Sequence, residues 1–253
     1  MNHHWRWLVV WLTFASFSSA PVQAGQALGP QHFEYRIAWN GLPAAHATVE
    51  VNPEQLATDP GYVVTATAST NALVDLFWRF RGQARTTFLA VGTVPLRFSY
   101  ERRTNDTPEV TWIDFDLGAD RAQSVYIKRT RRKEFDVAAA NVVDPITAAF
   151  RAMTSDVELG QELSYRVFTG ESHYQVNLKV VGPDIVDVPA GRFDALKIEP
   201  EIIKLGDEPR RDKRLRRATI WVTPAPARTL LRIRSEVFIG AVTLDLVCSE
   251  PSV

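Results

Sequence analysis

The sequence predicts an all-β fold, mainly antiparallel, in which a strongly curved sheet or half-open β-barrel surrounds one or two short helices. Apolar and polar residues alternate along most of the chain, which is typical of half-buried strands. Clusters of Gly, Pro, Asn or Asp separate most of the alternating runs, as turns do in antiparallel meanders. No predicted strand is followed by a helix of crossover length, which argues against a parallel doubly wound sheet.

The first 24 residues predict a signal peptide that is cleaved after export. The apolar run from Trp7 to Phe17 is far shorter than the roughly 20 residues of a membrane-spanning helix. Val22 and Ala24 stand where a signal peptidase requires small residues, so we expect cleavage between Ala24 and Gly25. We therefore expect a periplasmic protein of the cell envelope, with no transmembrane segment after cleavage and a single antiparallel β domain over residues 25–253.

Charge and cysteine content exclude some classes of protein. The chain has 29 basic and 29 acidic side chains, so its bulk charge predicts neither nucleic-acid binding nor a strongly acidic substrate. Cys248 is its only Cys, which excludes an intrachain disulfide. Because Cys248 ends a predicted strand, we expect a small buried apolar residue there, with a reactive thiol as the alternative.

Strands are predicted wherever apolar residues recur at every second position. Phe33, Tyr35 and Ile37 share one face of the first strand. The Asn40-Gly41 pair follows it and predicts a tight hairpin turn. Further strands are expected near residues 48–51, 62–69, 96–100, 110–117, 124–129, 163–168, 174–180, 215–222, 231–239 and 242–248.

Two segments interrupt this alternation. In residues 144–153, Asp144 is a candidate N-cap, Pro145 stands at the first helical position, and the apolar residues after them recur at helical spacing. A short helix is predicted there. In residues 71–80, Asn71 is a candidate cap for one or two helical turns through Trp78, and a continued strand is the alternative.

The stretch IVDVPAGRFDALKIEP, residues 185–200, predicts a structural hairpin. Pro189 fixes the entry to the turn, and Gly191 allows a positive φ. The apolar residues on the two sides of the turn are slightly out of phase, which predicts a β-bulge near Asp194-Ala195.

The same stretch resembles the V-x-x-P-A-G-x-F-x-A signature of a bacterial envelope family known as domain of unknown function 3108. Other segments resemble this family in the same order along residues 33–246: FEYRIAWNGLPAAHATVEV, VPLRFSYER, IDFD, VVDPITAAF, ATIWV and FIGAVTLDL. The chain departs from the family pattern at Ala44-Ala45, where a Gly is usual. The resemblance implies an exported curved β-sheet protein, distantly like periplasmic lipoprotein carriers, and it provides no catalytic residue.

Catalytic and cofactor-binding motifs are missing from the sequence. It has no G-x-S-x-G, H-E-x-x-H, P-loop or G-x-G-x-x-G motif. The histidines at 32, 46 and 173 are too widely spaced to predict a metal site, and we expect no cofactor. Asp114 and Asp116 share a strand face and could serve a carboxylate-based hydrolase. A solvent-facing pair is the simpler interpretation, so we expect a protein that is not an enzyme.

Two tracts concentrate basic residues. The first contains Lys128, Arg129, Arg131, Arg132 and Lys133, and the second contains Arg210, Arg211, Lys213, Arg214, Arg216 and Arg217. Solvated hairpin ends explain each tract alone, since basic residues also discourage strands from pairing edge to edge. Side by side, the tracts would form an anion-recognition patch for lipid phosphates, lipopolysaccharide or acidic polymers. Neither tract has the interleaved aromatic residues of nucleic-acid binding.

Aromatic residues provide a second candidate site. A half-open barrel can enclose an apolar groove, and six aromatic residues could line or cover it. Phe77, Trp78 and Phe80 are candidates for a lip or lid, and Trp39, Trp112 and Trp221 are candidates for the lining. Ordinary core packing is the alternative for each of them.

Three functional hypotheses follow, in decreasing order of preference. The first is an exported binding or carrier protein whose apolar groove takes lipid or lipoprotein acyl chains. The second is a structural or interaction protein of the envelope that binds an anionic envelope polymer or a partner through its basic surface. The third is a hydrolase that uses the carboxylate pair.

Overall fold

The structure is a computed structural model that describes residues 29–57, 59–156, 158–206, 210–211, 218–225, 228–237 and 239–251. The predicted signal peptide and its cleavage site, Ala24 and Gly25, lie outside the described residues. Among the residues that are described, none of the helices has the length and apolar character needed to cross a membrane.

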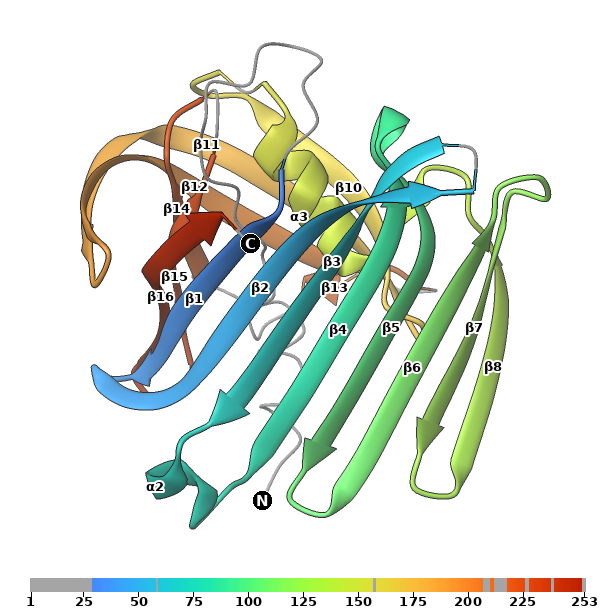
Figure 1. The fold of residues 1–253 in the computed structure, drawn as a ribbon, viewed down its shortest axis with the longest axis horizontal. Coiled ribbons are helices and arrows are strands. Elements are labelled where there is room, and N and C mark those ends of the chain that lie inside the picture. The colour runs from blue at the N-terminus through green and yellow to red at the C-terminus, as the bar shows by residue number, and fades with distance from the viewer. Residues whose placement is uncertain are drawn as a thin grey trace.

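The described strands form one mostly antiparallel sheet, which confirms the predicted all-β fold (Figure 1). The strands are β1 (Gln31–Trp39), β2 (Leu42–Leu56), β3 (Asp59–Thr70), β4 (Phe80–Leu89), β5 (Val94–Thr104), β6 (Thr107–Asp116), β7 (Arg121–Lys128), β8 (Arg131–Ala138), β9 (Val142–Val143), β10 (Glu162–Phe168), β11 (His173–Val188), β12 (Gly191–Lys204), β13 (Arg210–Arg211), β14 (Ala218–Val222), β15 (Leu230–Glu236) and β16 (Ala241–Pro251). The helical elements are α2 (Ala72–Asp75), the 3-10 turn η2 (Val91–Thr93) and α3 (Pro145–Thr154).

The sheet is curved but not closed into a barrel. Its strand order is β8-β7-β6-β5-β4-β3-β2-β1-β16-β15-β14-β12-β11-β10-β9, with β13 paired to β12, so β8 and β9 are its two ends. Among the described strands, only β9 and β10 pair in parallel. Most neighbours in this order are also neighbours in sequence, because short turns join the antiparallel strands.

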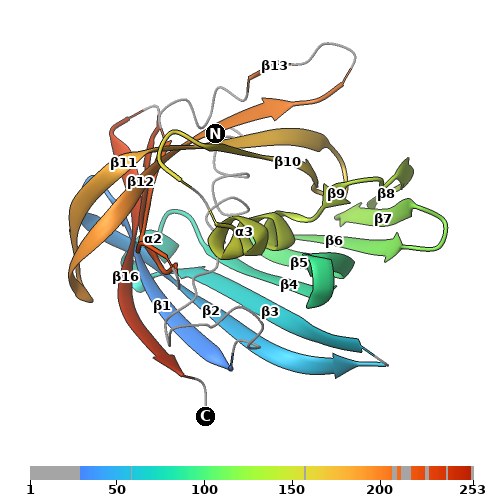
Figure 2. The ribbon, with the colours of Figure 1, turned by 90° about the horizontal axis from the view of Figure 1, so that it is seen from above.

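The α3 helix lies inside the curve of the sheet, between β4 and β10 (Figure 2). We call the face of the sheet that it contacts the inner face. The Phe150 ring of α3 is 5.4 Å from the Tyr62 ring and 4.5 Å from the Phe88 ring, measured between ring centroids. These aromatic contacts bury the apolar side of the helix against β3 and β4.

Both helix starts follow the sequence prediction. Asp144 caps α3: its Oδ1 accepts hydrogen bonds from the backbone N–H groups of Ile146 and Thr147 at 2.9 and 3.0 Å. Its Oδ2 accepts from the hydroxyls of Thr147 and of Thr86 on β4, the latter at 3.0 Å. Burial raises the pKa of Asp144, and the hydrogen bonds from Thr147, Thr86 and Ile146 oppose that rise. Asn71 caps α2 through Val74 N–H at 2.9 Å, which favours the helical alternative for that segment.

The two predicted hairpin turns are present, but the predicted bulge is misplaced. Asn40 and Gly41 join β1 to β2 with φ of 48° and 81°, the left-handed conformation that this residue pair favours. The second turn joins β11 to β12, and Gly191 has φ of 138°. No register shift occurs near Asp194-Ala195. The shift lies between Val180 and Gly182 on the opposite strand, which brings the two apolar sets into phase.

Asp144 joins α3 to the sheet, and its removal should destabilise both. We expect Asp144→Ala to lower the free energy of unfolding by about 2–4 kcal/mol, because it removes a helix cap and the acceptor of the buried Thr147 hydroxyl, and leaves the Thr86 hydroxyl to the Arg97 carbonyl at 3.2 Å. Asp144→Asn keeps the cap, and the threonine hydroxyls can turn to accept from its amide, so we expect a clearly smaller loss. Urea unfolding measures both variants. Equal losses would show that the negative charge, rather than the hydrogen bonds, holds the helix.

Candidate functional site

One end of the sheet carries most of the predicted site residues. Here lie α2 and the β1–β2, β5–β6, β7–β8 and β15–β16 turns, most of them along the lower edge of Figure 1. We call this end the α2 end, and the end with η2 and the β2–β3 and β6–β7 turns the opposite end.

A row of charged side chains crosses the inner face just inside the α2 end. Arg102 on β5, Glu109 on β6 and Lys128 on β7 are direct cross-strand neighbours. One Glu109 carboxylate oxygen contacts the Arg102 guanidinium, and the other lies 3.2 Å from Lys128 Nζ. Arg102 is only 7% exposed and Glu109 only 8% exposed. We call these three residues the charged row.

Tyr100 lies beside the charged row on the same face of β5. It is buried, its hydroxyl has no hydrogen-bond partner, and the Arg102 guanidinium carbon is 5.7 Å from the centre of its ring. Burial raises the pKa of Tyr100 to about 12, and the positive charge of Arg102 opposes that rise only in part. The hydroxyl therefore stays protonated at neutral pH and can donate a hydrogen bond to an acceptor.

The row could not be recognised from residue spacing alone. In the sequence, Arg102 follows Phe98 and Tyr100 at inner-face positions, and Glu109 precedes Ile113 at the same parity. The sequence did contain one sign of the row, namely charged residues at strand ends in positions where the pattern predicts apolar ones. Their proximity depends on the register between three strands, which the spacing within one strand does not contain.

The predicted lip residues lie next to the row. Phe80 is buried on the inner face, with its ring over Gly82, the cross-strand neighbour of Arg102. Trp78 stacks on Phe80 with ring centroids 5.5 Å apart. Phe77 is 79% exposed at the end of the α2 segment, so its side chain does not line the inner face.

Two of the predicted lining residues are on the wrong face. Trp112 lies on the outer face with Asp114, because successive strand residues face opposite ways and Ile113 is buried on the inner face. Trp221 also faces outward, and its Nε1 donates a hydrogen bond to Asp184 Oδ2 at 2.8 Å. That hydrogen bond lowers the pKa of Asp184.

Trp39 lies at the rim rather than deep in the sheet. It is the last residue of β1, and it is 40% exposed. Its indole Nε1 donates a hydrogen bond to the Ile239 carbonyl in the β15–β16 turn at 2.8 Å. The indole therefore joins two neighbouring turns of the α2 end.

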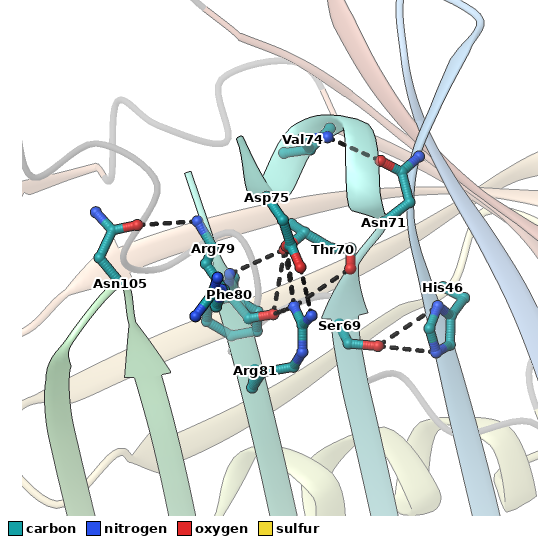
Figure 3. A network of polar contacts seen from close by, with 10 residues as sticks. All are labelled: His46, Ser69, Thr70, Asn71, Val74, Asp75, Arg79, Phe80, Arg81 and Asn105. Carbon is teal, nitrogen blue, oxygen red and sulfur yellow. Dashed lines mark hydrogen bonds and ion pairs between the residues drawn. The ribbon is translucent and has the colours of Figure 1, made fainter. Parts of the chain in front are cut away.

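A polar network holds the α2 segment against the sheet (Figure 3). Arg81 on β4 makes two contacts with the Asp75 carboxylate, at 3.1 and 2.5 Å, and Thr70 donates to the same carboxylate at 2.5 Å. The backbone N–H and carbonyl of Arg79 bond to Asn105 in the β5–β6 turn. Hydrogen bonds from Arg81 and Thr70 lower the pKa of Asp75 to about 2.

The first basic tract forms the β7–β8 hairpin at the α2 end. Lys128 and Arg131 are cross-strand neighbours beside the turn, and Arg129 occupies the turn itself. Arg132 and Lys133 extend along β8, the end strand of the sheet, where they pair with Glu134 and Glu171. Basic residues on a strand with a free edge discourage pairing with another chain, so this part of the tract has a structural explanation.

The second basic tract is mostly outside the described residues. The backbone of Arg210 and Arg211 forms β13, which pairs with the end of β12. Four residues of the tract lie outside the described ranges, namely Lys213, Arg214, Arg216 and Arg217. A joint patch formed by both tracts stays a prediction.

The carboxylate pair has structural partners. Asp114 forms an ion pair with Arg97 at 2.6 Å on the outer face. Asp116 Oδ1 accepts hydrogen bonds from the backbone N–H groups of Gly118 and Ala119, both at 3.0 Å, and so closes the β6–β7 turn. Across the described ranges, no group of three or more His, Cys, Asp or Glu side chains is arranged to hold a metal ion.

Cys248 is only partly buried, which corrects the expectation of a buried apolar residue. Its Sγ donates a hydrogen bond to Glu250 Oε1 at 3.3 Å. This hydrogen bond raises the pKa of the Cys248 thiol, so the reactive thiolate is less populated at neutral pH.

Comparison with known proteins gives a family and a fold. The model of the family DUF3108, described as a protein of unknown function, matches residues 34–247. No curated protein matches the chain. A β-barrel-like protein of the family DUF1849 from Brucella abortus has a similar structure, with a TM-score of 0.58 and 12% identity over 89% of this chain and 99% of that one. This similarity shows the fold alone.

Two further solved structures are less similar. One is a protein inferred to be exported, with a YmcC-like fold, from Bacteroides fragilis, with a TM-score of 0.34 and 13% identity. The other is a protein inferred to be a lipoprotein from Parabacteroides distasonis, with a TM-score of 0.33 and 12% identity. In both cases the match covers 93% of this chain and 99% of the other.

The Asp75–Arg81 contact should keep α2 ordered at neutral pH. Because the pKa of Asp75 is lowered to about 2, its carboxylate stabilises α2 above the ordinary Asp pKa of about 3.9. That stabilisation should disappear as the pH falls through about 2, which the amide resonance of Val74 would report by NMR. At neutral pH, Asp75→Ala should speed cleavage beside Phe77 by chymotrypsin. Asp114→Ala, which breaks an exposed ion pair on the outer face, is the control, and equal cleavage of both variants would contradict the role of Asp75.

Proposed function

The chain belongs to the family DUF3108, and we propose that it is an exported, non-enzymatic binding or carrier protein that holds an amphiphile on the inner face of its sheet. The ligand class is a lipid or the acyl chains of a lipoprotein, and the compartment is the periplasm. The predicted signal peptide supports export. The family itself has no known function, so the proposal depends on the site.

One observation carries the proposal: an apolar inner face ends, at the α2 end, in charged side chains. Phe98, Ile113 and Phe115 line the inner face of the strands that carry the charged row. Acyl chains gain free energy from such a surface, at about 25 cal/mol per Å² removed from water. A headgroup gains charge-assisted hydrogen bonds where the apolar surface stops.

The chemistry of the row favours an anionic headgroup. The cations of Arg102 and Lys128 share the Glu109 carboxylate, so a phosphate or carboxylate beside them meets more positive than negative charge. The protonated Tyr100 hydroxyl is a further donor next to Arg102. Lys128 is the most exposed of the three charged side chains and offers the approach from solvent.

The open sheet is also suited to a carrier. A sheet with two separate ends, β8 and β9, can widen between them without breaking a strand pair. The non-enzymatic part of the proposal is supported by the structural partners of Asp114 and Asp116. The second candidate function, binding through the basic surface, is favoured by one observation: Arg129 and Arg131 are exposed at the tip of the β7–β8 hairpin.

Native mass spectrometry tests the carrier function directly. Protein spanning Gly25–Val253, purified from the periplasm without detergent, should carry an added mass that disappears on solvent extraction. The extracted compound should be an amphiphile with an anionic headgroup. A single bare mass, together with no binding of a fluorescent lipid probe, would contradict the proposal.

Tyr100 separates ligand binding from stability. We expect Tyr100→Phe to leave the free energy of unfolding unchanged or to raise it by up to about 1 kcal/mol, because the lost hydroxyl has no partner. Binding of an anionic lipid probe should weaken about tenfold, the value of one charge-assisted hydrogen bond. Lys128→Gln should weaken binding similarly. Tyr35→Phe is the control: Tyr35 is also buried, but its hydroxyl donates to Leu230 O at 3.3 Å, so stability should fall while binding stays.

A further inference from the structure

We propose that the α2 end of the sheet docks on the surface of an anionic lipid bilayer. Apolar side chains from three turns enter the interfacial region, and exposed arginines from neighbouring turns contact lipid phosphates. This surface is distinct from the inner-face site, and docking does not require that an amphiphile is bound there.

Large apolar side chains are exposed together at the α2 end. Their exposed fractions range from 40% for Trp39 to 79% for Phe77. The set, which we call the apolar tips, consists of Trp39, Leu42, Leu73, Leu76, Phe77 and Ile239. Grouped apolar exposure on a folded surface marks a contact with a partner or a membrane.

Hydrogen bonds between the turns show that the turns with the apolar tips adjoin. Trp39 Nε1 donates to the Ile239 carbonyl at 2.8 Å, which joins the β1–β2 and β15–β16 turns. Asn71 donates to the carbonyls of Pro43, at 2.7 Å, and Ala44, at 3.0 Å, which joins the β1–β2 hairpin to α2. The tips therefore belong to one continuous edge.

Hydrogen bonds hold the α2 segment, which carries three of the apolar tips, in a fixed position. The Asp75–Arg81 contacts and the Asn71 cap fix the α2 turn (Figure 3). Leu76 and Phe77 follow this turn and are exposed. An unconstrained segment could fold these side chains onto the sheet and remove them from water. Holding them outward costs solvation free energy, which burial in a membrane interface would recover.

Exposed arginines continue the same edge. Arg79 follows the α2 segment, and Arg129 and Arg131 stand at the tip of the β7–β8 hairpin. The β5–β6 turn lies between them: Asn105 bonds to the Arg79 backbone, and Arg129 donates to Thr107 at 3.1 Å. Arg79 is near enough to Asp75 to contribute to the lowered pKa of that carboxyl, whereas Arg129 and Arg131 form no ion pair among the described residues.

Arg129 adopts a backbone conformation that is unusual for Arg. Arg129 has φ of 53°, in the left-handed region that favours Gly or Asn. Asn40 and Asn105 occupy that conformation in the β1–β2 and β5–β6 turns of the same end. Ala57 and Thr93 hold the same conformation in turns of the opposite end. An Arg here costs turn stability that an Asn would not, so Asn is the matched replacement for Arg129.

The opposite end is the more acidic of the two, although the α2 end also exposes Asp106 in the β5–β6 turn and Glu236 beside the β15–β16 turn. The turns of the opposite end expose Glu54 and Asp59 beside the β2–β3 connection, and Asp116 and Asp120 in the β6–β7 connection. A protein with no net charge can therefore still be oriented by a negative surface, with the α2 end toward it. Exposed arginines beside apolar tips match the lipid phosphates and the acyl boundary of an anionic bilayer.

Vesicle flotation tests the docking. The mature chain should float with vesicles of phosphatidylcholine and phosphatidylglycerol, and at least about tenfold less with pure phosphatidylcholine. The double variant Leu76→Ser with Phe77→Ser should lose at least about tenfold in binding. The double variant Arg129→Asn with Arg131→Gln should lose about 30-fold at low salt and keep its thermal stability, since Asn suits the turn.

Matched controls come from the opposite end. Val91→Ser and Leu117→Ser remove exposed apolar residues there and should leave flotation unchanged. No flotation of the native chain with anionic vesicles, or equal losses from both ends, would overturn the docking. So would a dimer, seen by light scattering, that the α2 variants dissociate, because the apolar tips would then bind a second copy.

The two proposals fail separately. The Leu76/Phe77 variant should keep the added mass in native mass spectrometry, because its substitutions lie outside the inner face. Tyr100→Phe should bind the anionic lipid probe about tenfold more weakly and still float with vesicles. Flotation without any bound amphiphile would overturn the carrier function and leave the docking in place.

Discussion

The fold depends on one constraint: an open, curved sheet must bury its inner face against something other than itself. The α3 helix meets this requirement where Phe150 contacts the rings of Tyr62 and Phe88. Its position is fixed by a buried carboxylate, since Asp144 both caps the helix and binds Thr86 of β4. Local helix geometry and long-range sheet packing therefore share a single anchor, and a change in either is transmitted to the other.

Because α3 contacts β4 and β10 beside η2, the inner face at the α2 end must be covered in another way. There the inner face changes from apolar side chains to the charged row, with Glu109 between Arg102 and Lys128. Buried charges of this kind cost desolvation and contribute little net stability. A hydrophobic row would stabilise the sheet better. Retaining charge at this position is therefore easier to explain by binding than by folding.

Much of the fold could be predicted from the sequence because strands with one buried face have a two-residue period. Local signals such as Asn40-Gly41 and Asp144-Pro145 also specified their turn and helix start. The register between neighbouring strands could not be predicted from the sequence, so neither the charged row nor the position of the bulge was predicted. That Trp112 faces outward could be predicted, because it stands two residues before Asp114 on the same side of the strand. The face of Trp221 could not be predicted from the pattern, because both of its neighbours are apolar.

The α2 end exposes apolar side chains, which would promote aggregation if they lay on a free strand edge. Exposed apolar residues on a free strand edge promote pairing with other chains, but here the tips occupy turns, a short helix and the ends of β1 and β2, which are paired on both sides. The strand at the sheet end, β8, instead exposes charged residues at Arg131 and Arg132. Apolar contact is thus confined to places where the backbone cannot extend the sheet. Such a surface is suited to reversible contact with a fluid apolar phase, as the proposed docking requires.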